Sequence, residues 1–217
     1  NDISSGQDDP QMLPLVGKLG LKYIAMHKRG DARTMQSMTD YDDVVEDVIG
    51  FFKEFAVKAQ ECGVRNWILD PGFGFAKTVS QNYIMMRDLR RFRLPYPSVG
   101  IPKILVGVSR KSMIYKALDI TPEESLPQTQ VLHLKALQEG ADILRVHDVA
   151  EAKRTVEVYW RLCGSDVFQE KYGVRAFVEQ QVHDRKVRNE AVFFSENLEI
   201  RLFKSKVLQD VVFPFGM

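Results

Sequence analysis

The chain has 217 residues, of which 45% are hydrophobic and 27% are charged, a balance typical of a globular protein. Its formal net charge of +1 gives no overall field that would attract nucleic acid or an anionic membrane, so we expect neither as a partner. No apolar run approaches the roughly 20 residues that a membrane-spanning helix needs. Cys62 and Cys163 lie far apart, without the spacing of a metal site, so we expect a reducing, cytoplasmic location and buried thiols.

Four short apolar segments predict strands that are covered on both faces, as in parallel sheets. They are residues 22–26, 67–69, 104–106 and 143–146. Each is followed by a polar loop and then by a stretch with the spacing of an amphipathic helix. These predicted helices cover residues 41–62, 81–92, 123–137 and 149–162, and Gly63 and Gly140 are placed to end the first and the third.

The alternation of strands and helices predicts βα units and a parallel sheet, either an open doubly wound sheet or a TIM (β/α)8 barrel. A barrel takes about 250 residues, so four units would form an incomplete one that lacks about four more. From about residue 164 the rhythm is lost, and the apolar segments at 192–194 and 211–215 are short and isolated. We therefore expect a partial barrel at residues 1–163 and a tail of unknown role at residues 164–217.

The first polar motif directly follows the strand at 67–69 and has the sequence Asp-Pro-Gly-Phe-Gly-Phe-Ala-Lys at residues 70–77. An acid at the carboxyl end of a strand points its carboxylate into the space that the strand ends surround. The glycines let the backbone pass close to a flat ligand. The alternative is a plain turn in which Asp70 caps the loop.

The second motif, Ser109-Arg110-Lys111-Ser112, follows the strand at 104–106 and begins a helix. Hydroxyl groups, two cations and free backbone N–H groups suit an anion or a polar heterocycle. A solvated helix start with Ser109 as the N-cap is the alternative. Basic residues at a helix N-terminus oppose the helix dipole, which favours the ligand-binding interpretation.

The third motif ends the strand at 143–146. Arg145 and His147 project to one side of that strand while Val146 faces the other, so an arginine and a histidine converge at the edge of the sheet. Such a pair would clamp a phosphate or a pyrophosphate. Alternatively, Asp148 caps the next helix and His147 bonds to it, and we expect Asp148 to cap that helix in either case.

The remaining histidines favour ordinary roles. His27 lies in a loop beside two cations, where a solvated side chain is the more common outcome, and His133 and His183 are expected to be structural. No close grouping of histidine, cysteine and carboxylate predicts a transition metal held by the protein.

Five segments, in chain order, resemble the motifs of dihydropteroate synthases. They are residues 1–6 (Asn-Asp-Ile-Ser-Ser-Gly), 26–27 (Met-His), 70–75, 109–112 and 145–149 (Arg-Val-His-Asp-Val). The resemblance runs from residue 1 to about residue 162. It implies a TIM barrel with its site at the carboxyl ends of the strands, where a pterin pyrophosphate would be joined to p-aminobenzoate.

The resemblance also implies roles for individual residues. The expected catalytic residues are Asp70, Lys111, Arg145 and His147. Asn1, Asp70 and Lys111 would hydrogen-bond the pterin ring. Arg145 would stack on the ring and, with His147, hold the pyrophosphate.

The other expected substrate-binding residues are Met26, Phe75, Lys77, Ser109, Arg110 and Ser112, in addition to Asn1. Ser112 and the adjacent backbone would receive the carboxylate of p-aminobenzoate. Phe75 and Lys77 would border that second pocket.

The implied cofactor is Mg²⁺ on the pyrophosphate of the substrate, with no metal ligand expected from this chain. The implied partners are the two small-molecule substrates and a second copy of the protein. A homodimer would form through the helices at 123–137 and 149–162, with Val156, Tyr159 and Trp160 on its apolar face.

Parts of the family pattern do not occur in these 217 residues. They are a Thr-Pro-Asp-Ser-type loop, a Ser-Thr-Arg-Pro-type loop and a strand that ends in a second pterin-binding aspartate. Two alternatives therefore stay open: an inactive half-barrel that pairs with a partner, and a pterin-binding domain that serves methyl transfer to a corrinoid. We also expect the chain by itself to lack synthase activity, because four strands cannot close an eight-stranded barrel.

Overall fold

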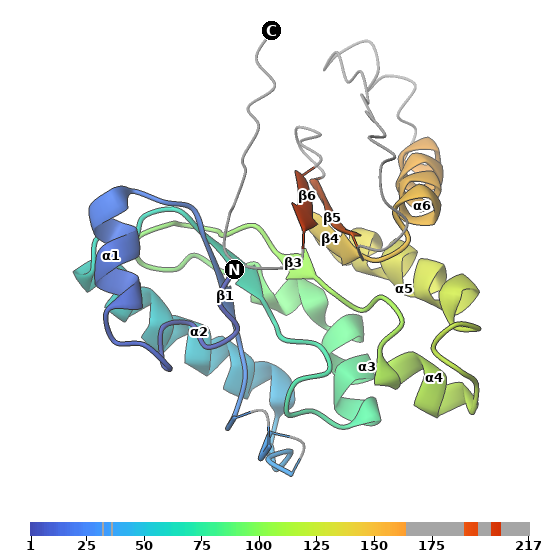
Figure 1. The fold of residues 1–217 in the computed structure, drawn as a ribbon, viewed down its shortest axis with the longest axis horizontal. Helices are drawn as coiled ribbons and strands as arrows, with labels where there is room; N and C mark the ends of the chain where they lie inside the picture. The colour runs from blue at the N-terminus through green and yellow to red at the C-terminus, as the bar shows by residue number, and fades with distance from the viewer. Residues whose placement is uncertain (32, 36, 164–188, 195–200, 205–217) are drawn as a thin grey trace, which may run out of the picture.

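The computed structural model describes residues 1–31, 33–35, 37–163, 189–194 and 201–204. Its strands are β1 Tyr23–Met26, β2 Trp67–Asp70, β3 Leu105–Val106, β4 Ile143–Val146, β5 Asn189–Phe194 and β6 Arg201–Lys204. Its helices are α1 Met12–Leu19, α2 Val44–Glu61, α3 Val79–Arg87, the 3-10 helix η1 Leu89–Phe92, α4 Ser112–Leu118, α5 Leu126–Gln138 and α6 Val149–Leu162. The four predicted strands are all present, and in Figure 1 helices α2 to α5 form an arc around one side of them.

Strands β1 to β4 lie side by side in chain order and run parallel. β1 pairs with β2, and β3 pairs with β4. A parallel bridge between Leu69 and Ile104 connects these two pairs, and another between Asp2 and Ala25 adds the N-terminal residues beside β1. This sequential order is that of a (β/α)8 barrel, whereas the order of a doubly wound sheet reverses at its switch point. The chain therefore forms part of a TIM barrel.

Alternate residues of each strand face opposite sides of the sheet. The outer side carries Leu69, Val106 and Leu144, which join the main core under the helices. The inner side carries a separate apolar cluster of Ile24, Ile68, Leu105 and Ile143. Two residues further along each strand, the same inner side carries Met26, Asp70, Gly107 and Arg145. A polar layer thus lies directly on an apolar one at the carboxyl ends of the strands.

Helix α2 supplies much of the outer layer. Asp43 caps it by accepting hydrogen bonds from two backbone N–H groups of its first turn. On its buried face, Phe52 and Phe55 pack on Trp67 of β2 with ring centroids 6.2 and 5.1 Å apart. These contacts fix β2, and therefore Asp70 at its end, against the helical layer.

The helices differ from the predictions in two respects. The segment predicted as one helix at 81–92 is interrupted at Asp88, and it begins at Val79 because Thr78 forms a capping box there. Helix α1 was not predicted, because its 8 residues give a periodic pattern too little length to be distinct, and helix α4, for which only a start at residues 109–112 was expected, begins at Ser112. The expectation of two buried thiols is wrong, since Cys62 is half-buried and Cys163 is exposed.

Beyond α6, the described residues form two strands that extend the sheet in the opposite sense. β5 runs antiparallel to β4, and β6 runs antiparallel to β5, so neither belongs to a βα unit. The expected division at residue 163 stays a prediction, and His183 and the segment at 211–215 lie outside the described residues. No described helix is both long and apolar enough to cross a membrane.

Two helical glycines offer a matched test of this packing. A Cβ at Gly17 of α1 would lie 1.8 Å from the backbone oxygen of Cys62, whereas a Cβ at Gly50 of α2 would meet no atom within 4 Å. We expect Gly17→Ala to lower the free energy of unfolding by roughly 1–3 kcal/mol through overpacking. Gly50→Ala should raise it by roughly 0.5–1 kcal/mol through helix propensity. Urea unfolding measures both, and shifts of the same sign would contradict the placement of α1 against α2.

Candidate active site

The base of the site is an ion pair between two strand ends. Nη2 of Arg145 lies 3.1 Å from Oδ2 of Asp70, and both side chains are largely buried. Oδ1 of Asp70 accepts a hydrogen bond of 2.9 Å from the N–H of Gly72. Among the described residues no donor is aligned for a hydrogen bond with Oδ2. Oδ2 of this buried carboxylate therefore lies in an ion pair but can still accept a hydrogen bond.

Gly107 makes room for the ion pair. A Cβ at this position would lie 2.9 Å from Nη2 of Arg145 and 3.0 Å from Nε. Since Gly107 directly follows β3, which stands between β2 and β4, a side chain there would force the guanidinium to shift from its position beside Asp70. Met26, fully buried and opposite Asp70 in the register, closes the other side of the layer.

The turn after β2 is held tightly against its neighbours. Gly72 has a φ of +74°, and a Cβ there would lie 1.9 Å from the backbone oxygen of His27. Nζ of Lys111 donates to the backbone oxygen of Phe73 at 2.5 Å and lies 5.0 Å from the ring centroid of Phe75. Lys111 therefore connects the loop after β3 to the turn after β2, and Phe75 is half-buried beside it.

Lys77, which the resemblance places at the border of the second pocket, is buried beneath the turn. Its Nζ donates to the backbone oxygens of Gly72 and Phe75 at 3.1 and 3.0 Å and lies 2.9 Å from Nδ1 of His27. His27 is buried too, contrary to the expectation of a solvated loop histidine. The Lys77–His27 contact links the loops after β1 and β2.

Burial and neighbouring cations alter the protonation of this pair. The pKa of Lys77 is lowered to about 7: burial is the largest cause, the charge of Asp70 opposes it, and the charges of Lys111 and Arg29 add to it. Burial, and then the charges of Lys77 and Arg29, hold the pKa of His27 well below its usual value, so the imidazole is neutral. The geometry suits both states of Lys77. An ammonium donates all three protons, and a neutral amine donates two and accepts from Nδ1–H.

The loop after β3 is anchored to the loop after β4. Oγ of Ser109 accepts a hydrogen bond of 3.3 Å from the N–H of His147. Arg110 forms an ion pair with Asp148 at 2.7 Å. Ser109 is therefore not the N-cap of α4, which is Lys111, and Asp148 makes no side-chain capping bond to α6. Ser112 is the first residue of α4, half-buried beside Lys111.

His147 and Asn1 are exposed, each beside a structural carboxylate. Asp2 follows Asn1 and accepts hydrogen bonds from the backbone N–H groups of Ser4 and Gly6 and from Oη of Tyr23 at 2.5 Å. Burial raises the pKa of Asp2, but these hydrogen bonds, of which that from Tyr23 has the largest effect, lower it below its ordinary value. Sequence reasoning missed this residue. An aspartate two residues before a serine is the available signal, since it is typical of an Asx turn.

A cavity of about 410 Å³ lies to the side of the strand ends, between the loop after β1 and α2. Its lining includes Lys28 and Arg29, which form ion pairs with Asp8 at 2.7 Å and with Asp47 at 3.3 Å. The described residues contain no group of three histidine, cysteine or carboxylate side chains that could hold a metal ion.

Comparison with known proteins identifies the barrel. Residues 1–147 match the family model of the pterin binding enzymes. The chain belongs to this family. The expected resemblance to dihydropteroate synthases is confirmed as well: over 167 residues the chain is 40% identical to the dihydropteroate synthase of Synechocystis, covering 74% of this chain and 56% of that protein. The chain thus spans about half the length of the curated relatives that it matches.

Two solved structures of family members have the same fold. The dihydropteroate synthase of Yersinia pestis in a sulfonamide drug complex superposes with a TM-score of 0.69 at 31% identity, covering 76% of this chain and 59% of that one. The enzyme of Thermus thermophilus in complex with 4-aminobenzoate gives a TM-score of 0.69 at 32% identity, covering 76% and 65%. The chain therefore shares the barrel architecture of these family members over its matched part.

Lys77 gives a pH-dependent prediction. The unfolded lysine binds a proton up to its ordinary pKa of 10.5, whereas the folded one releases it near pH 7. Unfolding therefore takes up a proton between these values, so Lys77 makes the protein more stable as the pH rises from 7 towards 10. We expect Lys77→Met to remove this increase.

Urea unfolding at several pH values from 7 to 9 checks the prediction. Lys53→Met, which removes an exposed lysine of α2, is the control for loss of charge. An unchanged pH slope in Lys77→Met would contradict the assignment.

Proposed function

We propose that this chain supplies the pterin- and pyrophosphate-binding part of a dihydropteroate synthase. In the proposed reaction, 6-hydroxymethyl-7,8-dihydropterin pyrophosphate and 4-aminobenzoate give 7,8-dihydropteroate and pyrophosphate. The observation that carries the proposal is the Asp70–Arg145 pair, in which a buried carboxylate oxygen retains capacity for a ligand N–H at the strand ends. Family membership and the 4-aminobenzoate complex of the Thermus relative support the choice of substrates.

In the proposed reaction the carboxylate of Asp70 and the guanidinium of Arg145 have different roles. Asp70 accepts N–H groups of the pterin and favours positive charge on its ring, while Arg145 stacks on the ring and reaches towards the pyrophosphate with His147. The bond from the methylene carbon to the pyrophosphate oxygen breaks first, and the amine nitrogen of 4-aminobenzoate then bonds to the cationic methylene carbon. The leaving group takes the electron pair, and the proton of the amine passes to solvent. Arg145 and His147 stabilise the anion that leaves, so catalysis is electrostatic and positional.

Fewer described residues would take part in binding 4-aminobenzoate and the metal ion. Ser112 and the start of α4 would receive the carboxylate of 4-aminobenzoate, next to the half-buried ring of Phe75. Mg²⁺ bound to the substrate's pyrophosphate would neutralise part of its charge. An inactive half-barrel and a methyl-transfer domain remain the alternatives. The groups at residues 109–112, together with Arg145 and His147, favour a substrate that carries a pyrophosphate over a methylated pterin.

A test of the site removes the guanidinium at its base. We expect Arg145→Ala in the full-length protein to weaken binding of the pterin pyrophosphate by roughly 2–4 kcal/mol, because a charge-assisted contact in a largely buried site is lost. Binding of 4-aminobenzoate should change much less. Isothermal titration calorimetry with each substrate measures both effects.

Two further variants sharpen this test. Gly107→Ala keeps Arg145 but forces its guanidinium to shift, so this variant should also weaken binding of the pterin pyrophosphate. Arg154→Ala removes an exposed arginine of α6 and should change neither affinity. Equal losses for both substrates in Arg145→Ala would assign that residue a structural role.

The assembly and location are part of the same proposal. The protein would be a cytoplasmic homodimer that associates through α5 and α6, whose exposed apolar residues are Val131, Val158 and Leu162. Val156, expected on this face, is instead buried in the core, and Tyr159 and Trp160 are partly buried against it. Both described cysteines are free, which suits a reducing compartment.

Sedimentation equilibrium of the full-length protein at micromolar concentration tests the dimer. We expect a dimer for the wild type and a shift towards monomer for Val158→Asp, which places a charge in the apolar face. Val57→Asp, at a similarly exposed valine of α2, should leave the dimer intact. A monomeric wild type would reject this assembly.

A further inference from the structure

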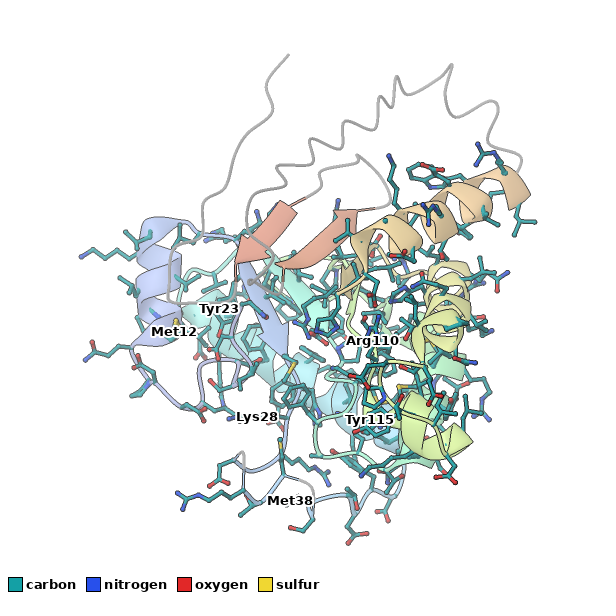
Figure 2. The ribbon with its side chains drawn as sticks, turned by 45° about the vertical axis from the view of Figure 1, so that its right-hand side comes forward. Met12, Tyr23, Lys28, Met38, Arg110 and Tyr115 are labelled. Carbon is teal, nitrogen blue, oxygen red and sulfur yellow. The ribbon has the colours of Figure 1, made fainter. Side chains whose placement is uncertain are left out.

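Arg110 connects three segments of the chain through one guanidinium. Its Nε and Nη2 donate to the two carboxylate oxygens of Asp148 at 2.8 and 2.7 Å. Its Nη1 donates to the backbone oxygens of Pro122 and Glu123 at 3.3 and 3.1 Å. The loop after β3, the loop after β4 and the segment before α5 are therefore joined by a bidentate, charge-assisted contact. In Figure 2 Arg110 lies among the side chains between the strands and helices α4 and α5.

The backbone of Arg110 is unusual for a residue with a long side chain. Its φ is +51°, in the left-handed region that favours glycine or asparagine. Its N–H donates to Oγ1 of Thr129 at 3.2 Å. The strained conformation is held because the side chain and the amide are both bonded to neighbouring segments, and it directs the guanidinium towards Asp148 rather than towards the strand ends.

The residues on either side of this contact are those of the proposed site. Lys111, which follows Arg110, donates to the turn that begins at Asp70, and Ser109, which precedes it, accepts from the N–H of His147. On the other loop, His147 immediately precedes Asp148. We propose that Arg110 is a positioning residue for the pyrophosphate substrate: by fixing Asp148 it sets the separation between Lys111 and His147. This inference rests on the proposed function, and it replaces the substrate contact that the sequence suggested for Arg110.

A second ion pair at the opposite ends of the same two strands provides a matched control. Nη1 of Arg93 donates to Oδ2 of Asp142 at 2.8 Å and to the backbone oxygen of Gly140 at 2.7 Å. The same Oδ2 accepts from the N–H of Ile104 at 2.8 Å. Arg93 and Arg110 thus both bind an aspartate at one end of β4 and a backbone oxygen, but Arg110 does so beside the proposed site and Arg93 at the opposite end of the strand.

The experiment compares Arg110→Lys with Arg93→Lys in the full-length protein. Lysine keeps the charge but cannot form the bidentate contact. We expect both variants to lower the urea midpoint, whereas Arg110→Lys alone should raise the Kd and KM for pterin pyrophosphate, by about tenfold or more, because the binding groups are misplaced. The Kd for 4-aminobenzoate should change less. Equal effects of the two variants on pterin pyrophosphate, or no effect of Arg110→Lys, would overturn the proposal.

Asp148→Asn separates positioning from direct contact. If Arg110 bound the anion itself, releasing it from Asp148 would strengthen binding. If Arg110 acts through Asp148, Asp148→Asn weakens binding as Arg110→Lys does, and the double variant is no worse than either single one. Stronger binding, or additive losses, would overturn the positioning role.

Hydrogen exchange tests whether Arg110 anchors the two loops without requiring that the protein bind the proposed substrate. If the wild type fails to bind pterin pyrophosphate, the proposed function fails, but the amides of Lys111 and His147 still report the anchoring of the two loops. They should exchange faster in Arg110→Lys than in Arg93→Lys. Equal exchange in the two variants would show that Arg110 does not position these loops.

Discussion

The site depends on one constraint, the alternation of side chains along parallel strands that stand next to each other in chain order. Because every second residue faces the inside of the barrel, Ile68 and Ile143 fill one layer, and Asp70 and Arg145 fill the layer above it. β3 stands between these two strands, so a Cβ on the intervening residue would lie 2.9 Å from the guanidinium and would force it to shift. The intervening residue is Gly107, which has no Cβ. The ion pair is therefore a consequence of strand order and register as much as of residue type.

The charge around Asp70 explains why the site suits an anion together with a polar ring. Arg145 pairs with this one buried carboxylate, whose charge also raises the pKa of Lys77, whereas the charge of Lys111 contributes to lowering the pKa of Lys77. Burying like charges together is unfavourable unless some lose their protons or a counter-ion binds. Lys77 can lose its proton without losing its contacts, since His27 can donate in its place. Lys111 and Arg145 are less buried than Lys77, and in the proposed function a bound pyrophosphate would supply their counter-charge.

The sequence predicted the fold, and the residues at the strand ends, better than it predicted the contacts within the site. Four buried strands were identifiable because short apolar runs bounded by polar loops are typical of strands covered on both faces, and the position of Asp70 and Arg145 at strand ends followed from them. The partners of Arg110 and Lys77 were not predictable in this way. Both residues are cations in loops, and sequence separation does not reveal that Asp148 or His27 lies within bonding distance. Asp148 shows the same difficulty, because it stands where an N-cap belongs but bonds to Arg110 instead.

Three of the five described non-glycine residues with a positive φ lie in or beside the same loops, and the other two are Ser98 and Asp119. Ser5, Ala76 and Arg110 all have positive φ values, and they lie in the segments that carry the first, third and fourth of the family motifs or directly adjoin them. Such conformations cost of order 1–3 kcal/mol each and persist only where the surroundings fix them. Here the fixing contacts are identifiable: Ser5 donates to the backbone oxygen of Met26, and the residue after Ala76 is the buried Lys77. Because each strained residue is held to a strand end or to a neighbouring loop, the loops cannot relax independently. The carboxyl-end loops of the barrel are thus connected from the N-terminal loop to α6, with Arg110 at the connection between the loops that carry Lys111 and His147.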